Sequence, residues 1–140
     1  MARVHLPTEL RRLVIARARA CCEYCLLHRD DTEFSHQVDH LVAVKHNGLT
    51  IPENLSYACQ LCNRYKGSDV ATYDSLTNEL TPLFNPRAQS WGNHFRLSGV
   101  RIEGLTAIGR ATAQLLRLND EARLLDRQAL SLVGRYPPRP

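Results

Sequence analysis

Two closely spaced cysteine pairs constrain this chain more than any other feature. The pattern C-x-x-C occurs at residues 22–25 and again at residues 59–62, with 33 residues between the pairs. Two thiolates three positions apart on a tight turn can both lie about 2.3 Å from one zinc ion, and two such pairs complete a tetrahedron. We therefore predict a structural zinc site with four thiolate ligands: Cys22, Cys25, Cys59 and Cys62.

Other interpretations of the cysteines are a redox dithiol and separate core residues. A fifth cysteine, Cys21, offers a less favoured pairing with Cys25. In a reducing compartment paired C-x-x-C motifs indicate a metal site rather than disulfides. The 33 residues between the pairs exceed the 15–20 of common zinc ribbons, so a further folded element is expected between them.

Length and hydropathy define the class of protein. With 140 residues and 15.9 kDa, the chain is expected to form a single domain spanning residues 1–140. The first five residues are too few and too polar for a secretory signal, and no apolar run approaches the roughly 20 residues of a membrane span. We expect a cytoplasmic protein with no membrane partner.

The positive charge is concentrated at the N-terminus. Residues 1–20 contain five arginines and one glutamate, which gives +4, whereas the other 120 residues contain 13 basic and 13 acidic side chains. A basic segment on a neutral body favours attraction to a polyanion such as a nucleic acid. The alternative is an ordinary solvated helix face.

The order of expected elements is that of an α+β fold. Apolar periodicity, turn residues and capping residues predict helices and strands in alternation. Leu125 and Leu130 are expected to face the core from the last helix, and residues 80–93 are expected to be mostly loop. The expected elements are a helix over 6–20, strands over 38–44 and 55–58, a short helix from 62 to about 68, a hairpin of 94–97 with 100–103, a helix over 106–118, and a helix capped by Asn119 that ends near 133.

Three further motifs lie between and just after the cysteine pairs. They read V-D-H at 38–40, E-N-L at 53–55 and N-x-x-K-G at 63–67. Together with the cysteines they resemble the HNH endonucleases, whose fold is called ββα-metal. The resemblance covers residues 20–70 and predicts a core over about 20–75. An extension over about 91–135 resembles the tails of standalone bacterial members.

The resemblance implies roles for four residues. His40 corresponds to the general base, and an imidazole can accept a proton from water near neutral pH. Asp39 and Asn63 correspond to the ligands of a catalytic divalent ion, and their hard oxygens favour Mg²⁺ or Mn²⁺. Asn54 corresponds to the middle residue of the motif and suits holding the loop and steering His40. Many members have histidine where this chain has Asn63, so it is an H-N-N variant.

Two basic residues follow Asn63. Lys66 lies nearly one helical turn later and could reach a substrate phosphate, and Arg64 is a second substrate-binding candidate. Their alternative is to be solvated helix charges. A regular strand would direct Asp39 and His40 to opposite faces, so we also predict that the strand ends or becomes irregular at this point.

The resulting hypothesis is a metal-dependent endonuclease that hydrolyses DNA, with RNA as an alternative substrate. A homodimer is compatible with double-strand cutting, which needs two sites or one site acting twice. A competing interpretation is a catalytically silent, zinc-scaffolded module that binds nucleic acid, which would have no use for Asp39, His40 and Asn63 together. A third is a partner-binding accessory protein of a defence or mobile-element system.

Overall fold

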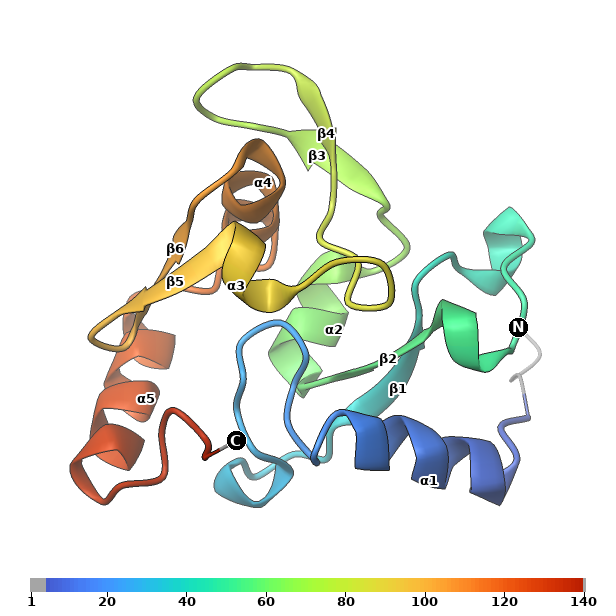
Figure 1. Ribbon diagram of the computed structural model, residues 1–140, viewed down its shortest axis with the longest axis horizontal. Helices are drawn as coiled ribbons and strands as arrows, with labels where there is room; N and C mark the ends of the chain where they lie inside the picture. The colour runs from blue at the N-terminus through green and yellow to red at the C-terminus, as the bar shows by residue number, and fades with distance from the viewer. Residues whose placement is uncertain (1–4, 140) are drawn as a thin grey trace.

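The computed structural model describes residues 5–139, and it confirms the α+β class. Arg3 of the basic segment lies outside these residues. Paired antiparallel strands alternate with helices along the chain, and every sheet has two strands (Figure 1). No helix within residues 5–139 combines the length and apolar character needed to cross a membrane.

The segment between the cysteine pairs folds as two strands followed by a helix. Strand β1 (Gln37–His40) pairs with β2 (Leu55–Ala58) so that His40 lies opposite Leu55, and α2 (Gln60–Lys66) follows directly (Figure 1). The strand predicted over 38–44 is therefore wrong beyond His40. After the Leu41 amide donates to the Asn54 carbonyl at 2.8 Å, the chain bends away into the 3₁₀ turn Val44–His46.

The N-terminal helix α1 (Thr8–Arg17) begins after Pro7 and is shorter than predicted. Its Val14 is fully buried and packs on β2. Shortly after the end of α1, the backbone of Arg19 and Ala20 adopts the left-handed conformation, with φ of 54° and 60°. This conformation cannot continue a right-handed helix, so the chain turns there into the first cysteine pair.

The region after the core contains one hairpin that was predicted and one that was not. Strands β5 (Phe95–Ser98) and β6 (Arg101–Gly104) confirm the predicted hairpin, and the short helix α3 (Trp91–His94) precedes it. Strands β3 (Ala71–Tyr73) and β4 (Leu80–Pro82) form a hairpin that the sequence did not predict.

The unpredicted hairpin is held by a tertiary contact that lies far away in sequence. The side chain of Asp74 is completely buried between the strands and α4 (Ala107–Leu115). Arg110 of α4 donates to both of its oxygens, at 3.0 and 2.9 Å. This ion pair holds the pKa of Asp74 well below its usual range. Neighbouring residues carry no signal of such a partner, which explains why local patterns missed the hairpin.

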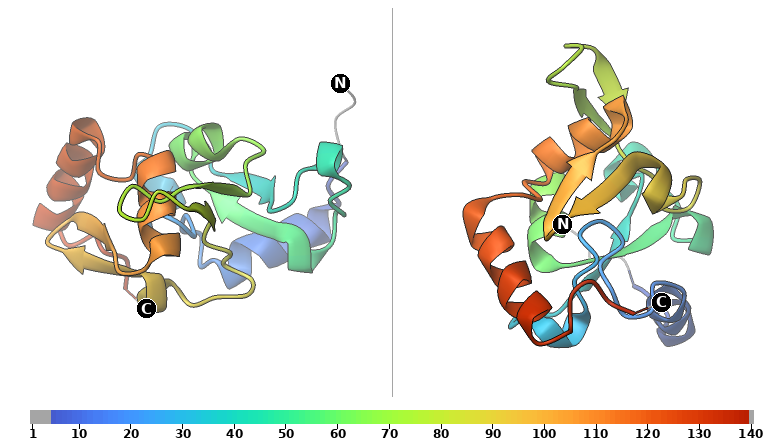
Figure 2. Two further views of the ribbon diagram at one scale, coloured as in Figure 1. Left: turned by 90° about the horizontal axis from the view of Figure 1, so that it is seen from above. Right: turned by 60° about the vertical axis from the view of Figure 1, so that its left-hand side comes forward.

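The last helix, α5 (Glu121–Leu132), shows two departures from prediction. It begins after Asp120, because the Asn119 side chain instead bonds both the amide and the carbonyl of Ile102 in β6, at 2.9 and 2.7 Å. Leu125, expected in the core, is 63% exposed, whereas Arg123 faces inward and is 6% exposed. Both views of Figure 2 agree with Figure 1 that α5 lies far from the loop joining β1 and β2.

Candidate functional site

The four predicted zinc ligands come together in the core. Their Sγ atoms all lie within 4.8 Å of one another, and those of Cys25 and Cys59 are 3.7 Å apart. Tetrahedral zinc with Zn–S bonds of about 2.3 Å requires sulfurs about 3.8 Å apart, so this donor set fits one zinc ion. All four thiols are buried, and Cys21 is not part of the cluster because its Sγ is directed to the Arg19 carbonyl at 3.4 Å.

A buried arginine from α5 contacts the cysteine cluster. The Nη2 atom of Arg123 lies 3.1 Å from the Sγ of Cys62 and 3.7 Å from that of Cys59, and its Nη1 donates to the Leu116 carbonyl at 2.7 Å. Burial works against the charge of Arg123, but the neighbouring cysteines raise its pKa above the ordinary value. Sequence reasoning missed this residue. The available signal was the i, i+4 spacing that puts Arg123 and Arg127 on one face of the helix, opposite Leu125 and Leu132.

We expect Arg123→Met to destabilise the fold by about 2–3 kcal/mol, because a charge-assisted contact to the thiolates is lost and buried carbonyls lose their donor. Urea unfolding measures the change. The exposed Arg96, paired only with Glu103, supplies a control in Arg96→Met, which should cost less than about 1 kcal/mol. Equal midpoints for the two variants would contradict a role for Arg123 at the cysteine cluster.

Strand β1 and helix α2 meet through two pairs of polar side chains. The Asn63 Nδ2 donates to the Gln37 Oε1 at 2.8 Å, and the Lys66 Nζ lies 3.1 Å from the Asp39 Oδ2. Gln37 and Asp39 share one face of β1, and Asn63 and Lys66 lie one turn apart on α2. Asp39, Asn63 and Lys66 are thus brought to one strand–helix interface.

The ion pair of Lys66 and Asp39 is largely buried, with the two side chains 3% and 15% exposed. Burial raises the pKa of Asp39 above its ordinary value, and the Lys66 ammonium partly offsets this effect. Lys66 also donates to the His40 carbonyl at 3.3 Å, so one ammonium bridges consecutive residues of β1. Arg64, by contrast, is exposed. The substrate contacts of Lys66 and Arg64 stay predictions.

His40 lies at the end of β1, where the pairing of the strand stops. The register with β2 continues without interruption through Asp39 and His40, and the chain bends immediately afterwards. The His40 Nε2 is 2.9 Å from the Thr50 Oγ1, which belongs to the loop joining β1 and β2. The ring is therefore held from that loop, while Asp39 is held from α2.

Asn54 closes the same loop with its side chain. Its Oδ1 accepts from the Val42 amide at 2.9 Å, and its Nδ2 donates to the Val42 and Leu49 carbonyls at 3.0 and 2.8 Å. The amide is used both as a donor and as an acceptor. An aspartate would lack the donor and a leucine would lack both, so neither could replace Asn54. Asn54 fixes the loop that carries Thr50 and does not itself contact the His40 ring in this hydrogen-bond network.

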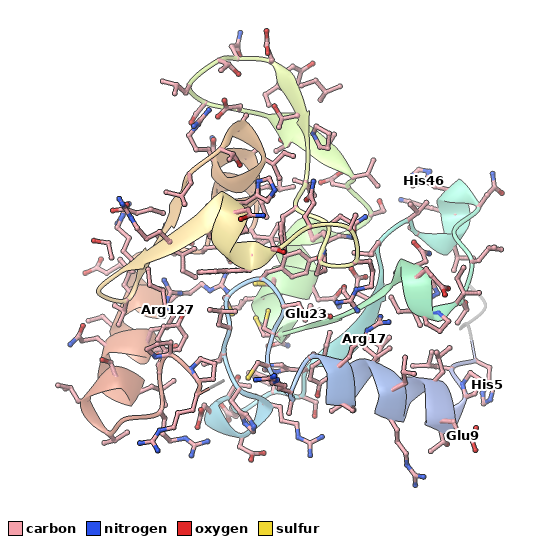
Figure 3. The ribbon with its side chains drawn as sticks, viewed as in Figure 1. His5, Glu9, Arg17, Glu23, His46 and Arg127 are labelled. Atoms are coloured by element: carbon pink, nitrogen blue, oxygen red, sulfur yellow. The ribbon has the colours of Figure 1, made fainter. Side chains whose placement is uncertain are left out.

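The outer edge of β2 is covered by two arginines and a glutamate. The Leu55 carbonyl, opposite His40 in the register, accepts from Arg17 of α1 at 2.5 Å and from Arg87 at 3.2 Å. Arg87 pairs with Glu23, which accepts from the Tyr57 amide at 2.9 Å. Figure 3 shows Arg17 extending from α1 toward β2, near Glu23. Sequence reasoning assigned no role to Arg87, which lies 32 residues after Leu55.

Residues 22–69 match the family model described as HNH endonuclease. This segment is similar to HNH endonuclease domains. The match confirms the family predicted from the motifs, and together with the cysteine cluster it indicates a nuclease-type function with metal binding. It includes both cysteine pairs and all four residues of the predicted catalytic set.

One curated relative supports this assignment. The chain is 28% identical to the Septu protein PtuB of Bacillus thuringiensis over 106 residues, which is 74% of this chain and 38% of the relative. The chain therefore spans about two fifths of the length of that relative. No solved structure matches the chain.

Proposed function

We propose that this chain is a metal-dependent endonuclease that hydrolyses phosphodiester bonds of DNA. The observation that supports this proposal is the interface of β1 with α2, where Lys66 contacts Asp39 and Asn63 bonds Gln37, with His40 next along the strand at its end. Hydrolysis needs a base to activate water, fixed geometry, and positive charge near the phosphate. These residues supply groups suited to each requirement, within a segment that matches a nuclease family.

His40 is the proposed general base. If its Nε2–H donates to the Thr50 hydroxyl, the Nδ1 atom retains a lone pair with which to accept a proton from water. Asn54 contributes indirectly, because it holds the loop that positions Thr50. Asn54 is thus a positioning residue in this proposal.

Asp39 and Asn63 are the proposed ligands of a divalent cation. The Asn63 Nδ2 donates to Gln37, which orients the amide and leaves its Oδ1 as an acceptor. A carboxylate and an amide oxygen are hard ligands, so the donor set fits Mg²⁺ or Mn²⁺. When bound, such an ion supplies charge neutralisation at the phosphate and the leaving oxygen.

Lys66 holds this arrangement in place, and we expect Lys66→Met to destabilise the fold by about 3–5 kcal/mol. The substitution leaves the buried Asp39 carboxylate without its counter-charge, which is costly in a low-dielectric interface. Thermal or urea unfolding measures the loss. On the same helix the exposed Arg64 offers a control, since Arg64→Met should change stability by less than about 0.5 kcal/mol. A Lys66→Met protein as stable as Arg64→Met would contradict the proposed role.

The substrate contacts outside the site follow from charge. Arg11 and Arg12 are exposed on α1, and each phosphate contact made by such residues would make binding weaker at higher salt. Contacts of this kind position a duplex without reading bases, so we expect low sequence specificity from this chain alone. RNA remains an alternative substrate, and a homodimer an alternative to one site acting twice.

The test is a cleavage assay on supercoiled plasmid with zinc-loaded protein. We expect nicked and then linear DNA when Mg²⁺ or Mn²⁺ is added, and intact plasmid when the divalent ion is omitted. A labelled single-stranded RNA assayed in parallel decides between the two substrates. Binding of DNA without cleavage under every divalent ion would overturn the proposal in favour of a silent zinc-scaffolded module.

A further inference from the structure

A basic pocket lies where the end of α1, the first cysteine turn and the C-terminal tail meet. It has a volume of about 420 Å³ and is lined by Arg19, Cys21, His28, Gly134, Arg135, Pro138 and Arg139. In Figure 1 and in the right-hand view of Figure 2, the C-terminal end of the chain lies beside the end of α1. None of these residues belongs to the interface of β1 with α2, so the pocket is separate from the proposed catalytic site.

The side chains that line this pocket are positively charged donors. Three are arginines, and the lining contains no carboxylate. A second pocket that also has three arginines differs, because Glu103 and Asp120 line it and its Arg110 is bound to Asp74. The tail pocket therefore concentrates positive charge that its own walls do not neutralise.

The pairing of the three arginines supports this description. Arg135 is bound to Asp31 at 2.5 Å, outside the lining. Arg19 and Arg139 are exposed, and neither forms an ion pair with a carboxylate in the part of the chain that the structure describes. Two guanidinium groups are thus available on the wall of one pocket. A third is held in place by a carboxylate behind it.

His28 adds a neutral donor. Its Nδ1 accepts from the Asp30 amide at 3.0 Å, so the neutral ring carries its proton on Nε2. The Asp30 carboxylate lies 3.7 Å from the His28 Nδ1. Arg29 in turn lies 4.0 Å from the other oxygen of that carboxylate. His28 itself is fixed because residue 28 forms a β-bridge with Cys21.

The backbone at this pocket is strained. Arg19 and Ala20 both have positive φ, a conformation that non-glycine residues rarely adopt. The Ala20 carbonyl accepts from the Arg29 amide at 2.9 Å, which holds the turn. Arg19 follows the end of α1 in this turn and lines the pocket together with Arg135 and Arg139 of the C-terminal tail.

We propose that this pocket binds a phosphate group. Guanidinium groups present paired N–H donors that match the oxygens of phosphate, and converging arginines without acceptors among them select an anion. The phosphate could come from a free nucleotide or from the backbone of a nucleic-acid strand. In the second case the pocket gives the chain a hold on nucleic acid at a point distinct from the proposed catalytic site.

The test measures binding by zinc-loaded protein without added divalent ion, so that its result does not depend on cleavage. Inorganic phosphate, a deoxynucleoside monophosphate and a short single-stranded oligonucleotide are titrated in turn by calorimetry. We expect Arg19→Gln and Arg139→Gln each to weaken binding about threefold, and the double variant about tenfold. For the oligonucleotide, the slope of log affinity against log salt should fall by about 0.7 in the double variant, the value for one phosphate on a single strand.

Arg96→Gln removes the same charge from the exposed surface of β5, outside the pocket and the proposed catalytic site, and serves as the control. It should leave phosphate and mononucleotide affinity within about twofold of the wild type. Loss with the mononucleotide alone identifies a nucleotide site, and loss with the oligonucleotide alone identifies a strand contact. The proposal is overturned if no probe binds, or if the double variant binds all three as the wild type does. Melting temperatures confirm that each variant is folded.

Discussion

Chelation of zinc is expected to unfold this protein. Metal binding in small zinc modules contributes about 10 kcal/mol to folding, which is comparable to the whole stability of a typical domain. Here the four thiols lie in the main core cluster, beside buried aromatic residues such as Tyr24 and Phe84. Without the ion, four buried sulfurs at the centre of the core would have no metal to coordinate. Circular dichroism during titration with a tight chelator should show cooperative loss of secondary structure.

The fifth cysteine provides the matched control for this result. Cys59→Ser should abolish stoichiometric zinc and lower the melting temperature strongly, whereas Cys21→Ser should retain one zinc ion per chain, because Cys21 lies outside the cluster. Both cysteines are buried, so a general intolerance of polar changes would affect them alike. A melting temperature that is unaffected by chelation would show that the cluster is not a structural zinc site.

His40→Ala is expected to reduce plasmid cleavage by about 10²–10⁴-fold, the usual contribution of a general base. The fold should be preserved, because the His40 side chain makes a single hydrogen bond, to Thr50, at the end of a strand. Zinc content and DNA binding should therefore match those of the wild type. The rate constant for the first nick, measured at saturating Mg²⁺, is the informative quantity.

Two further variants distinguish loss of the His40 imidazole from loss of the hydrogen bond that positions it. Thr50→Val keeps the imidazole but removes its partner, and should cost less activity than His40→Ala. His46→Ala removes an exposed histidine from the same loop and should leave the rate within about twofold. Cleavage by His40→Ala at the wild-type rate would remove that residue from the proposed mechanism.

The sequence predicted the parts of this protein that are encoded by local spacing. Two C-x-x-C motifs sufficed to identify the four thiols that meet, because each motif is one tight turn. The strand at Leu55–Ala58 and the hairpin after His94 were found for the same reason, since alternation and turn residues mark them directly. The family motifs also indicated Asp39, His40, Asn54 and Asn63 as candidate site residues, and their roles stay predictions.

The features that escaped prediction depend on partners that are distant in sequence. The role of Arg123 at the cysteines was missed, because Leu125 was expected to face the core and the cysteines lie more than 60 residues earlier in the chain. The second hairpin depends on Arg110, 36 residues after Asp74. Lys66 appeared to be a helix charge near substrate, and its pairing with Asp39 requires the packing of α2 on β1. Local patterns do not encode such long-range electrostatic pairings.

The arginines that reach the core from outside residues 22–69 have a consequence for how the chain can be divided. Arg87 supports the β2 edge, Arg123 contacts two of the four sulfurs, and the Tyr136 hydroxyl donates to the Cys25 carbonyl at 2.8 Å. The family segment therefore lacks the groups that satisfy its own backbone and thiolates. A fragment that ends near residue 75 would lose all three contacts, so we expect the segment of residues 22–69 to be stable only as part of the longer chain.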